Sequence, residues 1–223
     1  MTLSIKISDA SFTNVVGVGG CPSLTGALAF HLFGGNSADS LKNYAGAKVA
    51  GTVVGAVTYS TGYVSLSDTI GIDSGIVGNS PFTHIAVCSL NSNSGLYCGH
   101  WASGVTRNAL GKNGTNLGLA VDGGFRASTP MSGAGFHFIA GSHNGTTAKV
   151  YRGAGGSLTT ASGSHTGGTG ATASFRTGAN GLASGTFNCA AVLTFNTVLT
   201  EVEILAWYAY LTNLLATRSV TVL

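Results

Sequence analysis

Short runs of alternating apolar and polar residues, separated by glycine-rich turns, make up most of this chain of 223 residues. The runs are rich in Val, Ile, Thr, Phe and Tyr, and their alternation is typical of strands with one buried face. With 35 glycines and only 3 prolines, turn signals recur at short intervals. The pattern predicts strands at residues 3–7, 27–33, 48–55, 63–68, 82–90, 95–101, 117–122, 136–143, 148–153, 173–179 and 189–195. Many short strands of this kind predict an all-β sandwich.

The clearest turn lies between the runs at 136–143 and 148–153. Asn144 and Gly145 sit there, and Asn-Gly supplies the positive φ angles that a tight hairpin turn requires. The sequence therefore predicts an antiparallel hairpin. The Gly, Ser and Thr-rich stretch at 153–174 is expected to be a long surface loop of the same domain.

One helix is predicted, over residues 201–215. Thr200 and Glu203 have the spacing of a capping box, in which each side chain bonds the backbone N–H of the other residue. Val202 and Leu205 begin an apolar stripe at helical spacing. We expect this short C-terminal helix to pack on the sandwich.

The composition favours one domain that assembles with other subunits. An apolar fraction of 44% is enough for a sizeable core, whereas charged residues make up only 8%, far below the usual quarter or so. A surface with so little charge can stay soluble through Ser, Thr, Asn and Gly, or it can be buried against neighbouring subunits. We expect an N-terminal arm or strand at residues 1–22 and a single sandwich domain at residues 23–223.

Charge and hydropathy argue against two kinds of partner. The net charge of +3 comes from scattered Lys and Arg, without the cluster that would follow a phosphate backbone, so nucleic acid is not expected. No apolar run is long enough to insert into a membrane, and Asp9 interrupts the start too early for a signal peptide. We expect the chain to be made in the cytoplasm and to leave it only inside a larger particle.

Four cysteines lack metal-site spacing, and free thiols are the default in a reducing cytoplasm. Cys88 and Cys98 flank residues 89–97, which look like a hairpin loop. The sequence leaves a Cys88–Cys98 disulfide open as an alternative outside the cell.

Three blocks of the chain together resemble the concanavalin A-like, laminin-G-like domains found in phage tail and head-associated proteins. They lie at 27–76, 136–159 and 189–220, in the family's order, and the second is similar to its strand–Gly-Thr-Thr–strand hairpin. The resemblance implies a jelly-roll sandwich of two antiparallel sheets. It also implies a virion component of a bacteriophage.

Calcium is a cofactor associated with this fold class, and Asn36, Asp39 and Asn43 in one loop are the candidate ligands. The loop reads GGNSADSLKNYAG where the family has an Asp-rich one, which weakens an inherited site. Calcium needs six to eight oxygen ligands. The alternative is that these side chains simply close turns, and no cofactor is the main expectation.

The acidic residues give no sign of an enzyme. Glucanases with this architecture use two glutamates as nucleophile and acid/base, about 5 Å apart. The only two glutamates here, Glu201 and Glu203, belong to the predicted helix start. A glycan-degrading enzyme would require two aspartates to converge, from the set Asp39, Asp68, Asp73 and Asp122. A Ser-His-Asp triad stays open, because its members need to meet only in space.

Sugar binding on such folds uses an aromatic side chain with a few polar neighbours. Trp101 is the best candidate, with Arg107, Asn108 and Tyr97 beside it. The alternative is that Trp101 belongs to the core or to a subunit interface.

The sequence therefore predicts a non-enzymatic surface protein of a phage particle, in a tail fibre, collar or capsid-surface position. Its expected partners are copies of itself, other virion proteins and, at a tip, a host cell-surface glycan. One alternative is a capsid decoration or cement protein without a ligand. A glycan-degrading enzyme is a further and weaker alternative.

Overall fold

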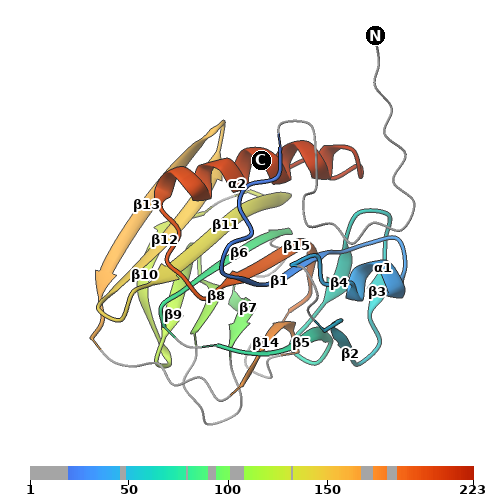
Figure 1. Ribbon diagram of the computed structural model, residues 1–223, viewed down its shortest axis with the longest axis horizontal. Helices are drawn as coiled ribbons and strands as arrows, with labels where there is room; N and C mark the ends of the chain where they lie inside the picture. The colour runs from blue at the N-terminus through green and yellow to red at the C-terminus, as the bar shows by residue number, and fades with distance from the viewer. Residues whose placement is uncertain are drawn as a thin grey trace.

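A computed structural model describes residues 20–45, 49–78, 80–89, 94–100, 108–131, 133–166, 173–179 and 185–223. Within these residues the chain forms two antiparallel sheets and two helices, and the predicted all-β sandwich is confirmed (Figure 1). The predicted strand at 3–7 lies outside the described residues. The division into an arm at 1–22 and a domain at 23–223 stays a prediction.

In the described part of the chain, sheet A has eight strands. Their order is β13 (Ser157–Ser164), β12 (Thr147–Ala154), β11 (Phe136–His143), β6 (Phe82–Ser89), β15 (Phe187–Phe195), β4 (Val64–Leu66) and β3 (Thr58–Tyr59), with β1 (Ala27–Leu32) also paired to β15.

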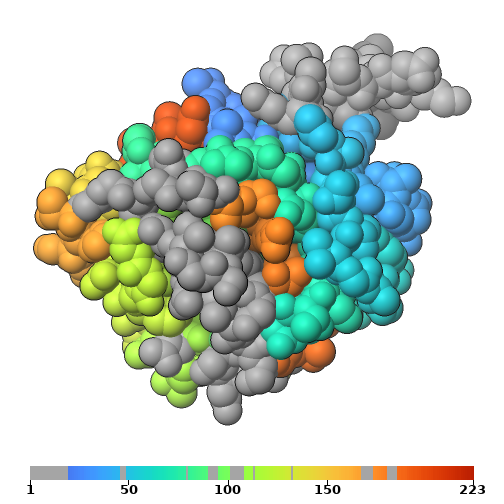
Figure 2. Space-filling model, turned by 90° about the horizontal axis from the view of Figure 1, so that it is seen from below, coloured from blue at the N-terminus to red at the C-terminus, as the bar shows by residue number. Residues whose placement is uncertain are grey.

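Sheet B has seven strands within the described residues. Their order is β10 (Gly124–Pro130), β9 (Asn116–Val121), β8 (Asn108–Asn113), β7 (Ser94–His100), β14 (Ser174–Gly178), β5 (Gly71–Val77) and β2 (Thr52–Val54). Figure 2 shows the molecule from the side opposite the C-terminal helix, with β9 and β10 in yellow-green and β14 in orange.

The C-terminal helix α2 (Glu201–Ala216) covers the outer face of sheet A, so the molecule has three layers (Figure 1). Trp207 is the centre of the helix–sheet core and packs edge-on against Phe30 and Phe195. A second core fills the space between the sheets, with residues such as Ile139 and Leu119. A short helix α1 (Ser37–Leu41), which the sequence pattern did not predict, follows β1.

The predicted Asn-Gly hairpin is confirmed as β11 and β12, with Gly145 at a φ of 99°. The predicted loop at 153–174 is wrong in part, because β13 (Ser157–Ser164) pairs with β12 along its whole length. A second tight turn, at Gly155 and Gly156 with φ angles of 56° and 80°, starts this strand. β13 is an edge strand of small, mostly polar residues, so it lacks the apolar alternation that predicts a strand.

Within the described residues, no helix is both long and apolar enough to cross a membrane.

Candidate functional site

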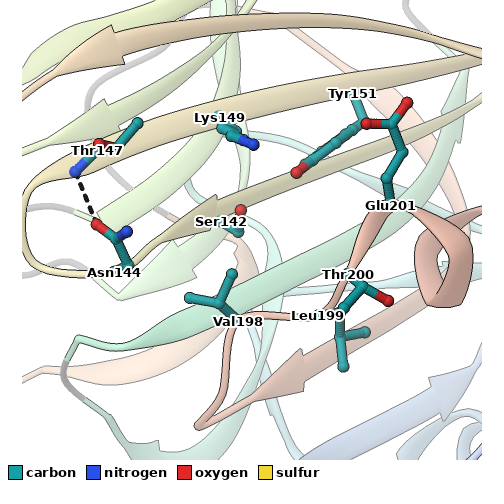
Figure 3. Close-up of a pocket in the computed structure, with 9 residues that line it drawn as sticks. All are labelled: Ser142, Asn144, Thr147, Lys149, Tyr151, Val198, Leu199, Thr200 and Glu201. Carbon is teal, nitrogen blue, oxygen red and sulfur yellow. Dashed lines mark hydrogen bonds between the residues drawn. The ribbon is translucent and has the colours of Figure 1, made fainter.

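A pocket of about 190 Å³ lies on the outer face of sheet A, where the β11–β12 hairpin meets the start of α2 (Figure 3). Nine residues line it: Ser142, Asn144, Thr147, Lys149, Tyr151, Val198, Leu199, Thr200 and Glu201. Pockets for drug-sized molecules hold roughly 300–1,000 Å³. This pocket therefore fits a small group.

The hairpin supplies a polar wall to the pocket. Thr147, Lys149 and Tyr151 alternate along β12, so their side chains share the face of the strand that points toward α2. Ser142 of β11 lies directly opposite Lys149 in the strand register. Figure 3 shows these side chains on the same side of the sheet. The Asn-Gly turn therefore places four hydrogen-bonding side chains together.

Asn144 closes the turn at one end of the pocket. Its amide oxygen accepts hydrogen bonds from the backbone N–H groups of Thr146 and Thr147, at 2.9 and 2.8 Å. The oxygen is thus used by the turn, and Figure 3 shows the amide nitrogen on the side of Ser142. Asn144 offers a ligand a donor.

The other wall is the start of α2. The predicted capping box is present: the Thr200 hydroxyl accepts from the Glu203 N–H at 3.3 Å, and the Thr200 N–H donates to Glu203 Oε2 at 2.7 Å. The Thr200 N–H and the Thr200 hydroxyl, which also donates to Glu203 Oε2 at 2.8 Å, lower the pKa of Glu203. The box fixes the helix start and leaves the Glu201 carboxylate at the pocket rim.

Charge in the pocket is balanced between one cation and one anion. Lys149 and Glu201 form no salt bridge within the described part of the chain. Tyr151 is buried, and burial raises the pKa of its phenol; the Glu201 carboxylate adds to this rise, whereas a hydrogen bond with Ser142 opposes it. The phenol therefore stays protonated and can donate at neutral pH.

The residues predicted to bind a sugar do not form a site in the described structure. Trp101 and Arg107 lie outside the described residues. Tyr97 is 1% exposed and packs edge-on against Phe187, with ring centroids 5.1 Å apart. Asn108 is fully buried in β8. Tyr97 and Asn108 therefore belong to the interior of the sandwich, which corrects their prediction as surface ligands.

The residues predicted to bind calcium hold the chain around α1. The Asn43 side-chain oxygen accepts from the backbone N–H groups of Phe30 and Ala45, both at 3.0 Å. Asn36 caps α1 by accepting from the Asp39 N–H, and its amide donates to the Asp39 carboxylate at 2.7 Å. These are the contacts of turn-closing side chains, the alternative that the sequence had left open.

The alternative of a Cys88–Cys98 disulfide is contradicted by the sheet topology. Cys88 lies on β6 of sheet A and Cys98 on β7 of sheet B, so they are not neighbours across a hairpin. Packed sheets are about 10 Å apart, whereas the Cα atoms of a disulfide are less than about 7 Å apart. Both cysteines are free thiols. The neighbour of Cys88 is Cys189, and their sulfur atoms are 3.3 Å apart.

A chain of four polar side chains lies where the two sheets meet. The Ser80 hydroxyl is 2.7 Å from His143 Nδ1, and His143 Nε2 is 3.2 Å from the His165 carbonyl oxygen. His143 Nε2 therefore donates and Nδ1 accepts from Ser80 and from the Gly145 N–H. Asp122 bonds His165 instead, at 2.7 Å. Asp122 does not orient His143, the histidine that contacts Ser80, so these residues do not form a catalytic triad. Their hydrogen bonds connect neighbouring turns instead.

The other described aspartates with side-chain partners are also held locally. Asp73 accepts from Arg176 at 2.8 Å and from Ser174 at 2.7 Å on sheet B. These hydrogen bonds outweigh the opposing effect of burial, so the pKa of Asp73 is lowered. Asp39, Asp73 and Asp122 therefore each have a different partner in a different part of the fold.

The pocket residues Ser142, Lys149 and Tyr151 were missed from the sequence. Alternation along the hairpin does place them on one face. The hairpin pattern alone does not show that the start of α2 covers this face.

No protein family model matches the chain, and no curated protein matches its sequence. Among solved structures, domain 4 of AbnA, a GH43 extracellular arabinanase from Geobacillus stearothermophilus in complex with arabinotriose, aligns with a TM-score of 0.60 and 19% identity. The match covers 81% of this chain and 98% of that domain.

Two further structures share the fold. The botulinum neurotoxin type G receptor binding domain has a TM-score of 0.62 and 12% identity over 82% of this chain and 51% of that one. Trypanosoma rangeli sialidase in complex with sialic acid has a TM-score of 0.61 and 13% identity over 90% of this chain and 36% of that one. The chain thus spans about half of the neurotoxin domain and about a third of the sialidase. These identities show a common fold only.

Proposed function

We propose that this chain is a non-enzymatic surface component of a bacteriophage particle, and that its sandwich binds a glycan in the pocket between the β11–β12 hairpin and α2. The observation that carries the proposal is the pocket's set of donors and acceptors on this fold. The similarity to domain 4 of AbnA, whose structure is a complex with arabinotriose, supports a sugar as the ligand class.

The pocket chemistry suits hydroxyl groups. A sugar hydroxyl both donates and accepts, so it can accept from Lys149 and donate to Glu201 in the same site. Ser142 lies beside Lys149 on the neighbouring strand, and the exposed Val198 offers an apolar contact to the C–H face of a sugar ring. A pocket of about 190 Å³ suits one ring and weak binding, which many copies on a particle would multiply.

The phage assignment rests on the resemblance of the three blocks at 27–76, 136–159 and 189–220, and on the low charge of the chain. We infer a tail fibre, collar or capsid-surface position. Its partners would be copies of itself and other virion proteins. Synthesis in the host cytoplasm without a signal peptide belongs to the same proposal.

A capsid decoration or cement protein is the second candidate, and the outer face of α2 favours it. Val202 is 77% exposed and Leu205 is 38% exposed, so the apolar stripe predicted to begin at these two residues is wrong: the buried face of α2 contains Ile204 and Trp207 instead. Apolar side chains on an exposed helix face are typical of surfaces that pack against another protein. In this case the particle would use the fold for contact area rather than for a ligand.

The test is a glycan array probed with the full chain displayed in many copies on beads. Lys149→Ala should reduce the retained signal at least tenfold on the bound glycans, because a charged hydrogen bond contributes about 1.5–3 kcal/mol. Lys112→Ala removes the same charge from sheet B, far from the pocket, and should bind as the unmodified chain does. Chelation of calcium should not change binding, since the pocket offers a single carboxylate and calcium needs several oxygen ligands.

Equal binding by both variants would contradict the pocket assignment. Absence of any retained glycan, together with incorporation of the chain into particles, would favour the cement function.

A further inference from the structure

Two cysteines that lie 101 positions apart in sequence meet in the centre of sheet A. Cys88 on β6 and Cys189 on β15 are register partners in adjacent antiparallel strands. Their sulfur atoms are 3.3 Å apart, and both side chains are fully buried. The thiols therefore face each other directly in the core between the sheets.

The strand register at this position brings the two cysteines close to the geometry of a cross-strand disulfide. Directly opposite residues in antiparallel strands have Cβ atoms about 4.5–5.5 Å apart, close to the range of about 3.5–4.5 Å found in disulfides. A shift of about 1 Å by the two sulfur atoms reaches the bonding distance of about 2.05 Å. The strand register is irregular between Cys189 and Ala191, so the Cys88–Cys189 pair lies next to a β-bulge, where the local backbone geometry departs from that of a regular ladder.

We propose that Cys88 and Cys189 form a disulfide when the protein folds in an oxidising environment, with a small-molecule disulfide such as oxidised glutathione as the oxidant. The thiolate of one cysteine attacks the oxidant, a mixed disulfide forms, and one glutathione thiolate leaves. The second cysteine attacks the mixed disulfide at the protein sulfur and releases the second glutathione. Two protein thiols are oxidised to one disulfide, and one glutathione disulfide is reduced to two thiols that take up the protons.

Burial decides when this exchange can happen. Desolvation raises the pKa of the Cys88 thiol well above its usual value, and a neutral, covered thiol does not attack a disulfide. The bond therefore forms while β6 and β15 are still apart, during folding or assembly. Once closed, it joins two neighbouring strands in the middle of sheet A.

Cys98 is the competing partner. It is also buried in the core between the sheets, but it lies on β7 of sheet B. A bond from Cys98 to either of the other two cysteines would pull the two sheets together across the core. The contact between Cys88 and Cys189 makes their bond the one that leaves the fold in place.

The experiment refolds the full chain from denaturant in a glutathione redox buffer and, in parallel, in excess reductant. Free thiols are then blocked by alkylation in denaturant, and chymotryptic peptides are mapped by mass spectrometry without reduction. Chymotrypsin cleaves after Leu90 and Tyr97, which separates Cys88 from Cys98. The expected result is a linked pair of peptides that contain Cys88 and Cys189, found only in the oxidised sample. The oxidised protein should melt roughly 5–15 °C higher than the reduced one.

Two variants test which cysteine pairs with Cys88. Cys98→Ser should keep the bond and the rise in melting temperature, whereas Cys189→Ser should lose both. If Cys189→Ser fails to fold, the peptide map of the unmodified chain and of Cys98→Ser still decides the pairing. A linked peptide with Cys98, or full alkylation of all four cysteines after refolding in oxidised buffer, would overturn the proposal.

Discussion

Replacement of His31 by leucine should make the protein less sensitive to acid. His31 is 1% exposed, stacks on Phe33 with ring centroids 6.0 Å apart, and has no hydrogen-bond partner for either ring nitrogen within the described residues. Burial lowers its pKa from 6.5 to about 4, and nearby backbone groups of Lys42 and Ser40, outside good hydrogen-bonding geometry, offset only part of the effect.

The size of the effect follows from proton binding. Between pH 6.5 and pH 4 the unfolded chain binds a proton at His31 and the folded chain does not. The free energy of unfolding therefore has its full value above pH 6.5 and decreases as the pH drops toward 4. For one histidine with these two pKa values, the free energy of unfolding decreases by about 2 kcal/mol from pH 8 to pH 5. His100 has the same pKa of about 4, and the pKa of His84 also lies well below its usual value, in both cases chiefly because of burial. His31 and His100 together would remove about 4 kcal/mol, a large part of the roughly 5–15 kcal/mol that stabilises a protein.

The assay is urea denaturation of the unmodified chain and of His31→Leu at pH 8 and pH 5, followed by tryptophan fluorescence. The difference between the two proteins at pH 8 reports packing alone, because the imidazoles are then neutral in both states. From pH 8 to pH 5 the unmodified chain should lose about 2 kcal/mol more than the variant, with an unchanged dependence on urea. Equal losses would show that the folded protein protonates His31 as readily as the unfolded chain does, and the reasoning from burial would be refuted.

Two further predictions concern stability at fixed pH. Thr200→Ala removes the capping box and should lower the free energy of unfolding by about 1 kcal/mol, whereas Thr200→Ser should restore most of it; urea denaturation that shows no loss for the alanine variant would argue against the cap. Gly163→Ala should be severely destabilising, because an added Cβ would lie 1.8 Å from the Arg126 carbonyl oxygen, where β13 of sheet A packs on β10 of sheet B. Gly155→Ala is the control, because no atom lies within 4 Å of the Cβ that it adds. It should lower the free energy of unfolding by only about 1–2 kcal/mol, the cost of its positive φ. Equal melting temperatures for the two variants would contradict the close packing of the sheet edges.

Local signals in the sequence determined the parts of this fold that depend on neighbouring residues. Asn144 and Gly145 predicted the turn between β11 and β12 because that turn requires positive φ angles. Thr200 and Glu203 predicted the start of α2 because the capping box is closed by residues three positions apart. Apolar alternation predicted strands that form a sandwich, although β6 and β11 are buried on both faces because α2 covers sheet A.

Edge strands and short helices gave weaker signals. β13 has small polar residues, since both sides of an edge strand are poorly buried, and its composition resembled that of a loop. The short helix α1 contains a single buried residue, Ser40, so it has no apolar stripe to detect.

The tertiary structure alone decided which residues from distant parts of the chain meet. Cys88 lies ten positions from Cys98 in sequence, yet consecutive strands went to different sheets and paired Cys88 with Cys189 instead. Leu96, Tyr97 and Cys98 are consecutive and all buried, and the strand register is irregular between Leu96 and Cys98, so simple alternation does not decide which face Tyr97 occupies. The pocket exists because the start of α2 lies beside the turn end of the β11–β12 hairpin. The sequence determined the elements through local backbone preferences, whereas strand order and layer packing, which depend on long-range burial, decided the site.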